Sequence, residues 1–468
     1  MWRGRYGLAV AAARAVSVVS RRAGHAGTAL PGLAAERIAP DVAARIADDL
    51  GPVVLISGTN GKTTTSHLLV HILEREGWEV IANRSGANLQ QGLTAALVAE
   101  AGLDGRLRRA GAVGVFEVDE AALGHIVNTV PVSQLVLLNL FRDQLDRFGE
   151  TDAIIHKWEA LCAALPATAA IVSCADDPRL AQLVATRVGP SIPFGFSEPV
   201  APSPDLSLTA DVSNCPRCDG RLERSWTSVG HLGDFMCGRC GFRRSGPAVG
   251  VRIVASRGID GQTLAFRTLR EPVERSVVVG LPGMSNAYNA AAAVAAAMSV
   301  GVPADRAVEA LADASPAFGR FEEVEMDGRR VVLTLGKNPA SLAELTRVGL
   351  ESGVSAVLFA FNDGFADGQD VSWFWDVDVA PLLDGRPFGI SGDRAPDFLL
   401  RVKYGATDGP RDVPRGFLET AEDPIVGLDT IVAATSPGNV VLVVATYTAL
   451  MRLRHGLVGR ALLPDHPR

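Results

Sequence analysis

Short apolar runs alternate with amphipathic segments along most of the chain. The run GPVVLI at 51–56 precedes a glycine-containing turn, SGTNGKTTT, and then a helical pattern over 67–73. A second long helix is expected at 286–300. Further apolar runs are expected to be strands, at 113–118, 134–138, 169–172, 249–255 and 276–279. This alternation predicts an α/β fold with a mainly parallel sheet.

The alternation restarts after a segment that is typical of a hinge. The sequence DASPAFG at 313–319 contains both proline and glycine. Apolar runs that read as strands follow it, at 330–335, 356–361, 388–391 and 440–445. At roughly 150 residues per domain, a chain of 468 residues holds two or three domains. We therefore expect a second α/β domain over 313–468.

Composition and charge exclude several classes of protein. Hydrophobic residues make up 47% of the chain and charged residues 21%, which is ordinary for a folded globular protein. A net charge of -7 gives no electrostatic footprint for nucleic acid, so we expect no nucleic-acid partner. The apolar stretch at 290–300 is shorter than the roughly 20 residues that a bilayer span needs.

The N-terminal segment at 1–45 is expected to be helical and to lie on the protein surface. Its apolar stretch at 8–13 is too short for a signal peptide, and Arg14 interrupts it. The cytoplasm is therefore the expected compartment. Peripheral contact with the inner face of the membrane is the alternative, because Leu8, Val18 and Val19 stand among arginines.

The segment Gly58–Thr65 has the pattern of a phosphate-binding loop. Backbone N–H groups of such a loop, together with the N-terminus of the following helix, cradle phosphates. Lys62 would reach the terminal phosphates, and the Thr63 hydroxyl would bind Mg²⁺. The strict pattern places glycine at the position of Ile56, whereas this chain has it at Gly58. A chance turn is the alternative, but the preceding strand and following helix favour nucleotide binding.

A cluster of acidic residues ends the expected strand at 113–118. Glu117, Asp119 and Glu120 follow one another in the sequence VGVFEVDE. The carboxyl edge of an α/β sheet lies beside the phosphate loop, so one of these carboxylates is expected to complete the Mg²⁺ site. A solvated acidic turn is the alternative.

Four of the six cysteines form two C-x-x-C pairs. Cys215 and Cys218 precede Cys237 and Cys240 by a spacer of 18 residues, which is the spacing of a zinc ribbon. Four thiolates leave no open coordination position, so the zinc would be structural. His231 is expected to be a surface residue. The module interrupts the strand pattern as an insertion at about 205–246, and Cys162 and Cys174 are expected in the core.

Six segments together resemble the Mur ligases. The insertion and the sequence NDGFADGQDVSWFWDVD at 362–378 narrow the resemblance to the MurT family, the Mur-ligase-like subunit of lipid II isoglutaminyl synthase. The resemblance extends over about 51–450. The six segments are GTNGKTTT at 58–65, FEVDEAAL at 116–123, NLFRDQLDRFGE at 139–150, CADDP at 174–178, GMSNAYNAAAA at 283–293 and FGRFE at 318–322.

The resemblance implies a domain plan. The central domain, at 46–312, would be a Mur-ligase-like P-loop ATPase domain that carries the zinc-ribbon insertion. The C-terminal domain, at 313–468, would be Rossmann-like. Lys62 lies too close to the N-terminus for a preceding UDP-binding domain, because a domain needs about 100 residues. A lipid-linked substrate is therefore expected.

The resemblance also implies roles for individual residues. ATP would convert a carboxylate into an acyl phosphate, with Asn289 at the adenine, Arg320 and Lys337 at the ribose and phosphates, and Thr63 with Glu120 on Mg²⁺. Asn289 as an ordinary helix residue and Arg320 as a linker ion pair are the alternatives. Lys157 fits only loosely the carbamylated lysine of many Mur ligases. The phosphates would be held by Gly58, Thr59, Asn60, Gly61, Lys62, Thr63 and Thr64.

The reaction implied by the family is amidation of the α-carboxyl of D-glutamate in lipid II. Ammonia would come from a GatD-type class I glutamine amidotransferase, which forms a heterodimer with the family's ligase subunit. An aspartate of the C-terminal domain would support the partner's Cys–His pair, with Asp376 as first candidate and Asp370 as second. The alternative is that these aspartates cap helices and that Trp373 and Trp375 anchor the core.

Two other functions compete with this one. A folylpolyglutamate-synthase-like amide ligase also lacks the UDP-binding domain, but the cysteine insertion and the SWFWD sequence at 372–376 argue against it. A zinc-ribbon scaffold with a vestigial loop is the non-enzymatic alternative. The agreement among the loop, the acidic strand end and Asn289 argues against that alternative.

Overall fold

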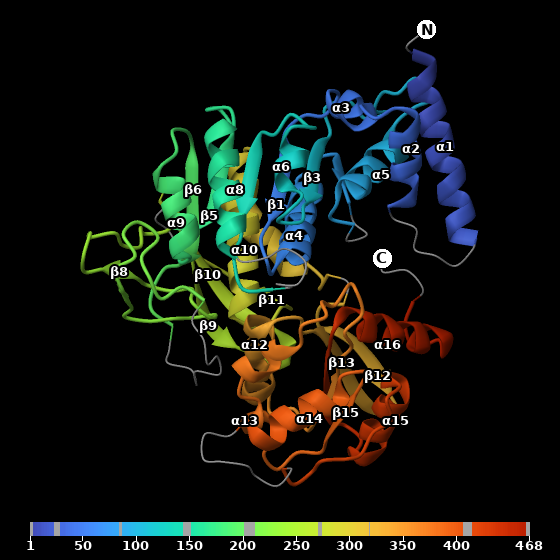
Figure 1. Cartoon of the computed structure of the whole chain (residues 1–468), viewed down its shortest axis with the longest axis vertical. Helices are drawn as coiled ribbons and strands as arrows, with labels where there is room; N and C mark the ends of the chain where they lie inside the picture. Colours follow the sequence, from blue (N-terminus) through green and yellow to red (C-terminus); the bar gives the residue numbers. More distant parts are fainter. Residues whose placement is uncertain are drawn as a thin grey trace.

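Two sheets organise the chain, one in the upper and one in the lower part of Figure 1. The structure is a computed structural model that describes residues 3–22, 29–83, 87–143, 151–200, 211–269, 274–317, 319–405 and 414–464. Helices cover both sheets, and a small module projects from the side of the upper one (Figure 1).

The upper sheet has nine strands in the order β11-β10-β9-β6-β5-β4-β1-β3-β2. Neighbouring strands from β2 to β9 in this order are parallel, whereas β10 is antiparallel to both β9 and β11. The bounds are β1 Val53–Ser57, β2 Val80–Ala82, β3 Val113–Glu117, β4 Gln134–Leu137, β5 Ala170–Cys174, β6 Ser191–Phe196, β9 Val249–Ser256, β10 Gln262–Thr268 and β11 Arg275–Val279.

Strand β1 lies between β3 and β4, and all three are fully buried. Parallel strands that are buried on both faces read as continuous apolar runs, which is why the sequence shows them clearly. Because the three strands are parallel, the residues that follow them emerge at one edge of the sheet. The phosphate loop, the acidic cluster and the sequence NLFRD at 139–143 therefore meet there.

Helices pack against the upper sheet, and the N-terminal helices lie at one side of it (Figure 1). The alanine-rich α10 lies against β5, β6, β9 and α4, and its alanines are almost completely buried. The bounds are α4 Lys62–Arg75, α5 Gln90–Glu100, α6 Leu123–Val127, α8 Thr151–Ala164, α9 Pro178–Ala185, α10 Met284–Ser299, α11 Ala304–Ala310, η1 Gly258–Asp260 and η2 Leu311–Asp313.

The N-terminal segment forms the expected surface helix. Helix α1 (Arg3–Arg22) packs on α2 (Leu30–Ile38) and α5, and α3 (Val42–Ala47) follows. Ala9, Val10 and Ala13 of α1 are buried, while Leu8 is 65% and Val19 67% exposed. Among the helices that the structure describes, none combines the length and the apolar character needed to cross a bilayer.

The lower sheet has five strands in the order β12-β13-β16-β14-β15. The first pair is antiparallel and the others are parallel. Separate apolar clusters fill its two faces. The bounds are β12 Glu322–Met326, β13 Arg329–Leu335, β14 Ala356–Ala360, β15 Phe388–Ser391, β16 Val440–Ala445, α12 Pro339–Ser352, η3 Ser372–Asp376, α13 Ala380–Leu383, α14 Ala395–Tyr404, α15 Pro424–Ala434 and α16 Tyr447–Gly459.

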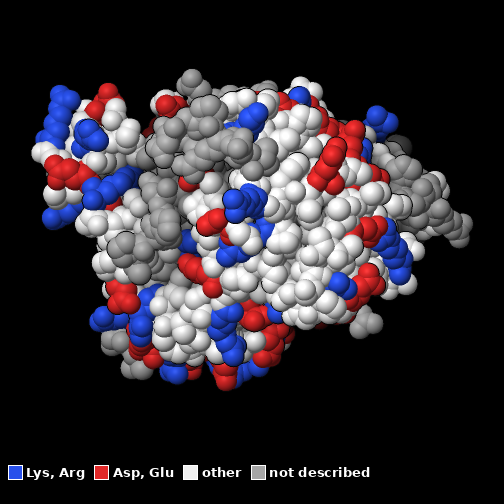
Figure 2. Space-filling view, turned by 90° about the horizontal axis from the view of Figure 1, so that it is seen from below, with Lys and Arg blue, Asp and Glu red and all other residues white. Residues whose placement is uncertain are grey.

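The module between β6 and β9 contains one short antiparallel pair, β7 (Leu222–Glu223) and β8 (Met236–Cys237). On the face seen in Figure 2, acidic and basic side chains are interspersed over most of the surface, and basic side chains gather on the lobe at the left. The exposed arginines of the module include Arg217, Arg221, Arg239 and Arg243. The predicted α/β fold class with its inserted cysteine module is confirmed.

Candidate active site

The loop between β1 and α4 depends on two glycines. Gly58 has a φ of 143°, and an added Cβ would lie 2.9 Å from the Cβ of Leu138. Gly61 is the N-cap of α4 with a φ of 91°, and its added Cβ would lie 2.0 Å from Oδ1 of Asn289. Ile56 lies within β1, so the loop turns at Gly58 instead of at the position that the strict pattern requires.

The segment after β4 holds this loop in place. Asn139 accepts a hydrogen bond from the Asn60 backbone N–H at 2.9 Å and donates its amide to Asn60 O at 3.0 Å. The Thr59 hydroxyl accepts from the Phe141 N–H at 3.0 Å and donates to Phe141 O at 3.2 Å. The loop conformation is therefore defined by strand β4 as well as by its own glycines.

Lys62 begins α4 and points back into the loop. Its Nζ lies 2.5 Å from Gly58 O and 2.8 Å from Oε2 of Glu120, and both side chains are buried. Burial disfavours the charge on Lys62, but the neighbouring Glu120 and Glu117 together raise its pKa above the ordinary value. The loop thus holds a permanent cation where phosphates would bind.

Three buried carboxylates lie at the carboxyl end of β3, where Glu117 is the last residue of the strand. Glu117, Asp119 and Glu120 are each less than a tenth exposed. Burial raises the pKa of Glu117. Burial acts in the same direction on Glu120, but Lys62 and Lys337 outweigh it and lower the pKa of that carboxyl.

A hydroxyl and these carboxylates make a donor set that suits Mg²⁺, which prefers oxygen ligands. The Thr63 hydroxyl donates to Oε2 of Glu117 at 2.9 Å, while Glu120 pairs with Lys62. Glu117 therefore joins Glu120 as a candidate ligand beside Thr63. The role of Glu120 on the metal stays a prediction.

The C-terminal domain closes over the same edge of the sheet. Lys337 Nζ lies 2.5 Å from Oδ2 of Asp143. Asn338, which caps α12, exchanges side-chain hydrogen bonds of 3.0 and 3.2 Å with Asn60 of the loop. Desolvation lowers the pKa of Arg320, and the carboxylates of Glu117 and Asp143 act in the opposite direction. Two predicted phosphate-side residues, Lys337 and Arg320, thus lie beside the loop.

Asn289 packs behind the loop. Its Oδ1 lies 3.4 Å from the Thr65 hydroxyl, and its amide donates to Asn286 at 3.1 Å. Its contact with adenine stays a prediction. Lys157 is exposed on α8, as expected of a surface lysine. The residues at 144–150 and Phe318, which belong to two predicted motifs, lie outside the described part of the chain.

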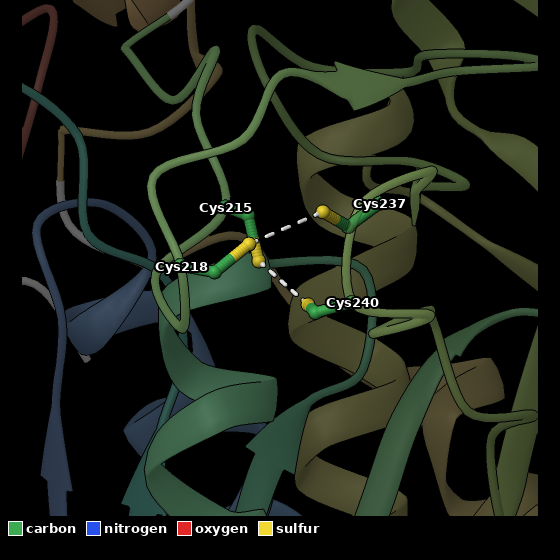
Figure 3. A group of neighbouring side chains, drawn as sticks. All are labelled: Cys215, Cys218, Cys237 and Cys240. Atoms are coloured by element: carbon green, nitrogen blue, oxygen red, sulfur yellow. Dashed lines mark hydrogen bonds between the residues drawn. The ribbon is translucent and has the colours of Figure 1, made fainter.

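The four cysteines converge in the module (Figure 3). All four sulfur atoms lie within 4.8 Å of one another, with Sγ–Sγ distances of 3.6 Å for Cys215–Cys240 and Cys218–Cys237. A tetrahedral zinc with bonds of about 2.3 Å would set its sulfur ligands about 3.8 Å apart. The geometry therefore fits the predicted zinc.

The two cysteine pairs lie in equivalent turns. Cys215 N–H donates to Gly220 O and Cys237 N–H donates to Phe242 O, each at 2.7 Å. The residues after each pair, Asp219 and Gly241, both have positive φ, of 59° and 71°. Within the described part of the module, its apolar cluster contains six buried residues, which are too few to stabilise a fold without a further crosslink or metal.

The module is attached to the upper sheet through a buried polar network. Arg244 donates to Oδ1 of Asp176 at 2.7 Å, and Tyr288 of α10 donates to the other oxygen at 2.7 Å. His231 lies 3.2 Å from Asp177, and neither side chain is exposed. The expectation that His231 is a surface residue is wrong, because its ring completes the contact between the module and α9.

Comparisons with known proteins match both halves of this arrangement. The Mur ligase middle domain matches residues 56–215, and the MurT ligase C-terminal domain matches residues 335–450. A subunit MurT of lipid II isoglutaminyl synthase (glutamine-hydrolyzing) from Streptococcus pneumoniae is 28% identical over 97% of this chain and 98% of its own length. The protein of the same name from Staphylococcus aureus is 28% identical over 87% and 90%. The chain is thus similar to the MurT subunits over most of its length, and to the Mur ligases through the middle-domain model.

The fold of a solved Mur ligase agrees with this assignment. The structure of MurF from Thermotoga maritima in complex with ADP has a TM-score of 0.63 to this chain at 16% identity, covering 88% of this chain and 81% of that one. At this identity the likeness concerns the fold alone. The MurT resemblance in the sequence is therefore confirmed.

The MurT segment at 362–378 lies at the boundary between the domains. Asp376, at the end of η3, accepts a hydrogen bond of 2.8 Å from Nη2 of Arg142. Asp370 accepts from the Ser372 N–H at 2.8 Å, just before η3, whose N-cap residue is Val371. The core anchor of the segment is Phe374, which is 1% exposed, whereas Trp375 is 45% exposed and is not the core anchor considered above.

Arg142, Asp143 and Asn338 belong to the site but were not predicted from the sequence. Arg142 and Asp143 lie in the segment that follows β4, the neighbour of β1, so their position shortly after a buried strand was the available signal. Asn338 precedes a proline at the start of α12, and this pattern indicates a helix cap but not a residue of the site.

Removing one thiolate is expected to release the metal and unfold the module. Cys215→Ser should abolish stoichiometric zinc, because structural zinc contributes folding energy directly. A loss of about 2 kcal/mol would lower the melting temperature by roughly 4–8 °C. Zinc by elemental analysis and calorimetry measure the two effects. Cys162→Ala is the matched control, since it alters the core and should retain the zinc; equal zinc in both variants would contradict the assignment.

The Lys62–Glu120 pair yields a prediction that separates stability from binding. Lys62→Ala should lower nucleotide affinity at least about tenfold and destabilise the fold by about 3–5 kcal/mol, because it leaves Glu120 buried and unpaired. Adding Glu120→Gln should recover stability but not affinity. Titration calorimetry with ADP and denaturant unfolding measure the two quantities. A single variant as stable as the wild type would show that the pair is not buried in solution.

Proposed function

We propose that this protein is the ligase subunit of a glutamine-dependent amidating enzyme that acts on lipid II. Its product would be D-isoglutamine, formed from D-glutamate of the stem peptide. The observation that carries the proposal is the small cavity that the MurT segment lines together with Lys337 and Asn338, because Asn338 is hydrogen-bonded to Asn60 of the phosphate loop. Both MurT relatives are named as subunits of such a synthase, and they match this chain over nearly their full length.

The reaction would proceed in two steps. A carboxylate oxygen of the substrate attacks the γ-phosphorus of ATP, the bond to the ADP oxygen breaks, and an acyl phosphate forms. Ammonia then attacks the acyl carbon, phosphate leaves with the bonding electron pair, and the nitrogen loses a proton. ATP, carboxylate and ammonia thus become ADP, phosphate and amide.

The chain's own residues would position the nucleotide and balance its charge. The N–H groups from Gly58 to Thr64 and the N-terminus of α4 would hold phosphate oxygens, with Lys62 at the terminal phosphates. Lys337 would approach from the C-terminal domain, and Arg320 would add a second cation. Mg²⁺ beside Thr63 and Glu117 or Glu120 would neutralise phosphate charge. The Thermotoga maritima MurF structure, which holds ADP, supports ATP as the cosubstrate.

The nitrogen would come from a separate subunit. Thiolates, not thiols, are the nucleophiles of class I glutaminases. Burial raises the pKa of Cys162 to about 12 and that of Cys174 well above its ordinary value. The other four cysteines form the metal cluster. None of the six therefore suits a glutaminase nucleophile, and the printed word "subunit" in the relatives' names agrees with a partner.

The segment at 362–378 is our candidate for contact with a GatD-type glutaminase. It exposes two aromatic side chains, Phe365 at 78% and Trp375 at 45%. Aromatic residues are enriched at protein interfaces. Asp376 lies in the same segment and would orient the partner's catalytic imidazole, as the third member of a hydrolytic triad does. Asp370 remains the second candidate.

The N-terminal helix would bring the enzyme to its lipid-linked substrate. Leu8, Val18 and Val19 of α1 are exposed, and an apolar face of this kind suits peripheral contact with a membrane. Such contact would place the ligase at the inner face of the membrane.

The proposed activity is tested by mixing the purified chain and its co-purified glutaminase with lipid II, glutamine and ATP. We expect amidated lipid II and ADP in equal amounts, measured by mass spectrometry and a coupled assay. ATP turnover with folate plus glutamate instead would support the folylpolyglutamate-synthase-like alternative. No turnover with either substrate would contradict a ligase function.

The role of Asp376 is tested by changing the nitrogen source. Asp376→Asn should reduce glutamine-driven amidation by about a hundredfold or more, because a triad carboxylate fixes the imidazole tautomer. Amidation driven by free ammonia should stay within about twofold of wild type. Asp370→Asn is the matched variant: a selective loss of glutamine-driven amidation in Asp370→Asn, with Asp376→Asn near wild type, would assign the role to the second candidate. Equal losses with both nitrogen sources would instead assign Asp376 to the ligase reaction.

A further inference from the structure

Arg142 is anchored on one side by a single carboxylate. Its backbone N–H donates to Oδ2 of Asp211 at 3.0 Å, and its Nε donates to Oδ1 of the same residue at 2.7 Å. The Asp211 side chain is 11% exposed. A bidentate contact that involves both the backbone and Nε fixes the orientation of the guanidinium plane. Asp211 therefore holds Arg142 with its remaining edge directed away from the module.

That remaining edge faces the C-terminal domain. Nη2 of Arg142 lies 2.8 Å from Oδ2 of Asp376, and the two residues line a small cavity of about 50 Å³ together with Lys337 and Asp370. Burial disfavours the charge on Arg142, but Asp211 and Asp376 outweigh it and raise its pKa. The cavity wall therefore carries a permanent cation with the planar geometry that suits carboxylates.

The two carboxylates on Arg142 differ in how firmly they are held. Asp211 is held by both the backbone and the side chain of Arg142, whereas Asp376 reaches Arg142 from another domain. The Arg142 and Asp376 side chains are 35% and 22% exposed. Partly exposed ion pairs contribute little to stability, because solvent screens them and both side chains lose conformational freedom. The ion pair of Arg142 with Asp376 can thus be replaced by another carboxylate, whereas the contact with Asp211 is expected to persist.

Arg142 also lies close to the phosphate loop along the chain. The preceding residue, Phe141, exchanges hydrogen bonds with Thr59 of the loop. The following residue, Asp143, pairs with Lys337. A carboxylate bound to Nη2 of Arg142 would therefore lie at the cleft between the domains, beside Lys337 and next to the segment that contacts the phosphate loop.

We propose that Arg142 binds the reacting carboxylate of the substrate, and that Asp376 occupies this receptor until the substrate displaces it. The proposal rests on the proposed function, since it names the substrate contact and the regulation of that same site. The displaced Asp376 becomes free to turn toward the imidazole of the glutaminase. Substrate binding and glutamine hydrolysis are thereby coupled through one exchangeable ion pair.

Coupling of this kind is reciprocal. A substrate carboxylate that displaces Asp376 from Arg142 raises the population of the conformation in which Asp376 contacts the imidazole of the glutaminase. Glutamine hydrolysis in the intact complex is therefore slow without substrate and faster with it. This arrangement limits the release of ammonia when no carboxylate is in place to accept it.

The receptor is tested in the intact complex with free ammonia as the nitrogen source. Arg142→Gln raises the KM for lipid II by about ten- to a hundredfold, the range expected when a charge-assisted hydrogen bond is lost, and leaves the KM for ATP within about twofold. Arg142→Lys, which retains the charge, recovers part of the loss. The control is Arg460→Gln, which removes an exposed arginine of the C-terminal domain that pairs with Asp429.

The source of the bound carboxylate is tested with a second substrate. Lipid II with an amidated C-terminal carboxyl shows the same dependence on Arg142 if the reacting carboxylate is the ligand. Loss of that dependence would overturn the assignment in favour of the peptide's C-terminus. An unchanged KM for lipid II in Arg142→Gln, in a variant that melts like the wild type, would overturn the receptor itself.

The exchange is tested by glutamine hydrolysis in the absence of lipid II. The wild-type complex hydrolyses glutamine slowly, and lipid II accelerates it. In Arg142→Gln, Asp376 has no ion pair to leave, so the basal rate rises toward the stimulated rate and no longer depends on lipid II. A basal rate equal to that of wild type would overturn the exchange. A wild-type complex that forms no amide at all would instead contradict the proposed function, which separates the two failures.

Discussion

The segment that leaves strand β4 is the constraint on which the rest of the site depends. Five consecutive residues, from Asn139 to Asp143, make contacts with four parts of the molecule. They hold the phosphate loop, the start of α9, the cysteine module and the C-terminal domain. Because the central strands are buried on both faces, their ends cannot shift independently. The position of this segment therefore determines how the domains and the loop meet.

Charge pairing explains how so many ionisable groups can share one cleft. Lys62 pairs with Glu120, Lys337 with Asp143, and Arg142 with two aspartates. A buried cation without a partner would be costly, so Glu120 balances the charge of the buried Lys62 before a nucleotide enters. In the proposed reaction, phosphates and the substrate carboxylate would take the place of the acidic partners.

The cysteine module contributes to this cleft although its metal site lies apart from it. Asp211, near the start of the described part of the module, orients Arg142, and His231 supports Asp177, which accepts the Leu140 N–H at 3.1 Å. The module's own apolar cluster is small, so a bound metal would stabilise the part of the chain that supplies these contacts. A structural metal can in this way affect the geometry of a site that it does not touch.

Local patterns in the sequence were sufficient for the elements whose stability is local. The buried parallel strands β1, β3 and β4, the loop glycines and the paired cysteines each leave a continuous or regularly spaced pattern, because burial on both faces or shared coordination restricts every position. Strands β2, β6, β10 and β12 were missed. Strand β2 is only three residues long, and β12 (EEVEM) is mostly acidic, so neither has a distinct apolar run.

The pairings across the site were decided only by the tertiary structure. The sequence shows Glu117 and Glu120 as equivalent neighbours of a strand end, but the positions of α4 and the loop assign Glu117 to Thr63 and Glu120 to Lys62. His231 reads as a surface residue until α9 is packed against the module. Arg142 and Asp376 are separated by 234 positions, and no local pattern relates them. The sequence alone determined the fold class, the loop and the clustering of the four cysteines, because short-range spacing specifies them. The docking of the two domains decided which charges meet, because that choice depends on contacts between distant segments.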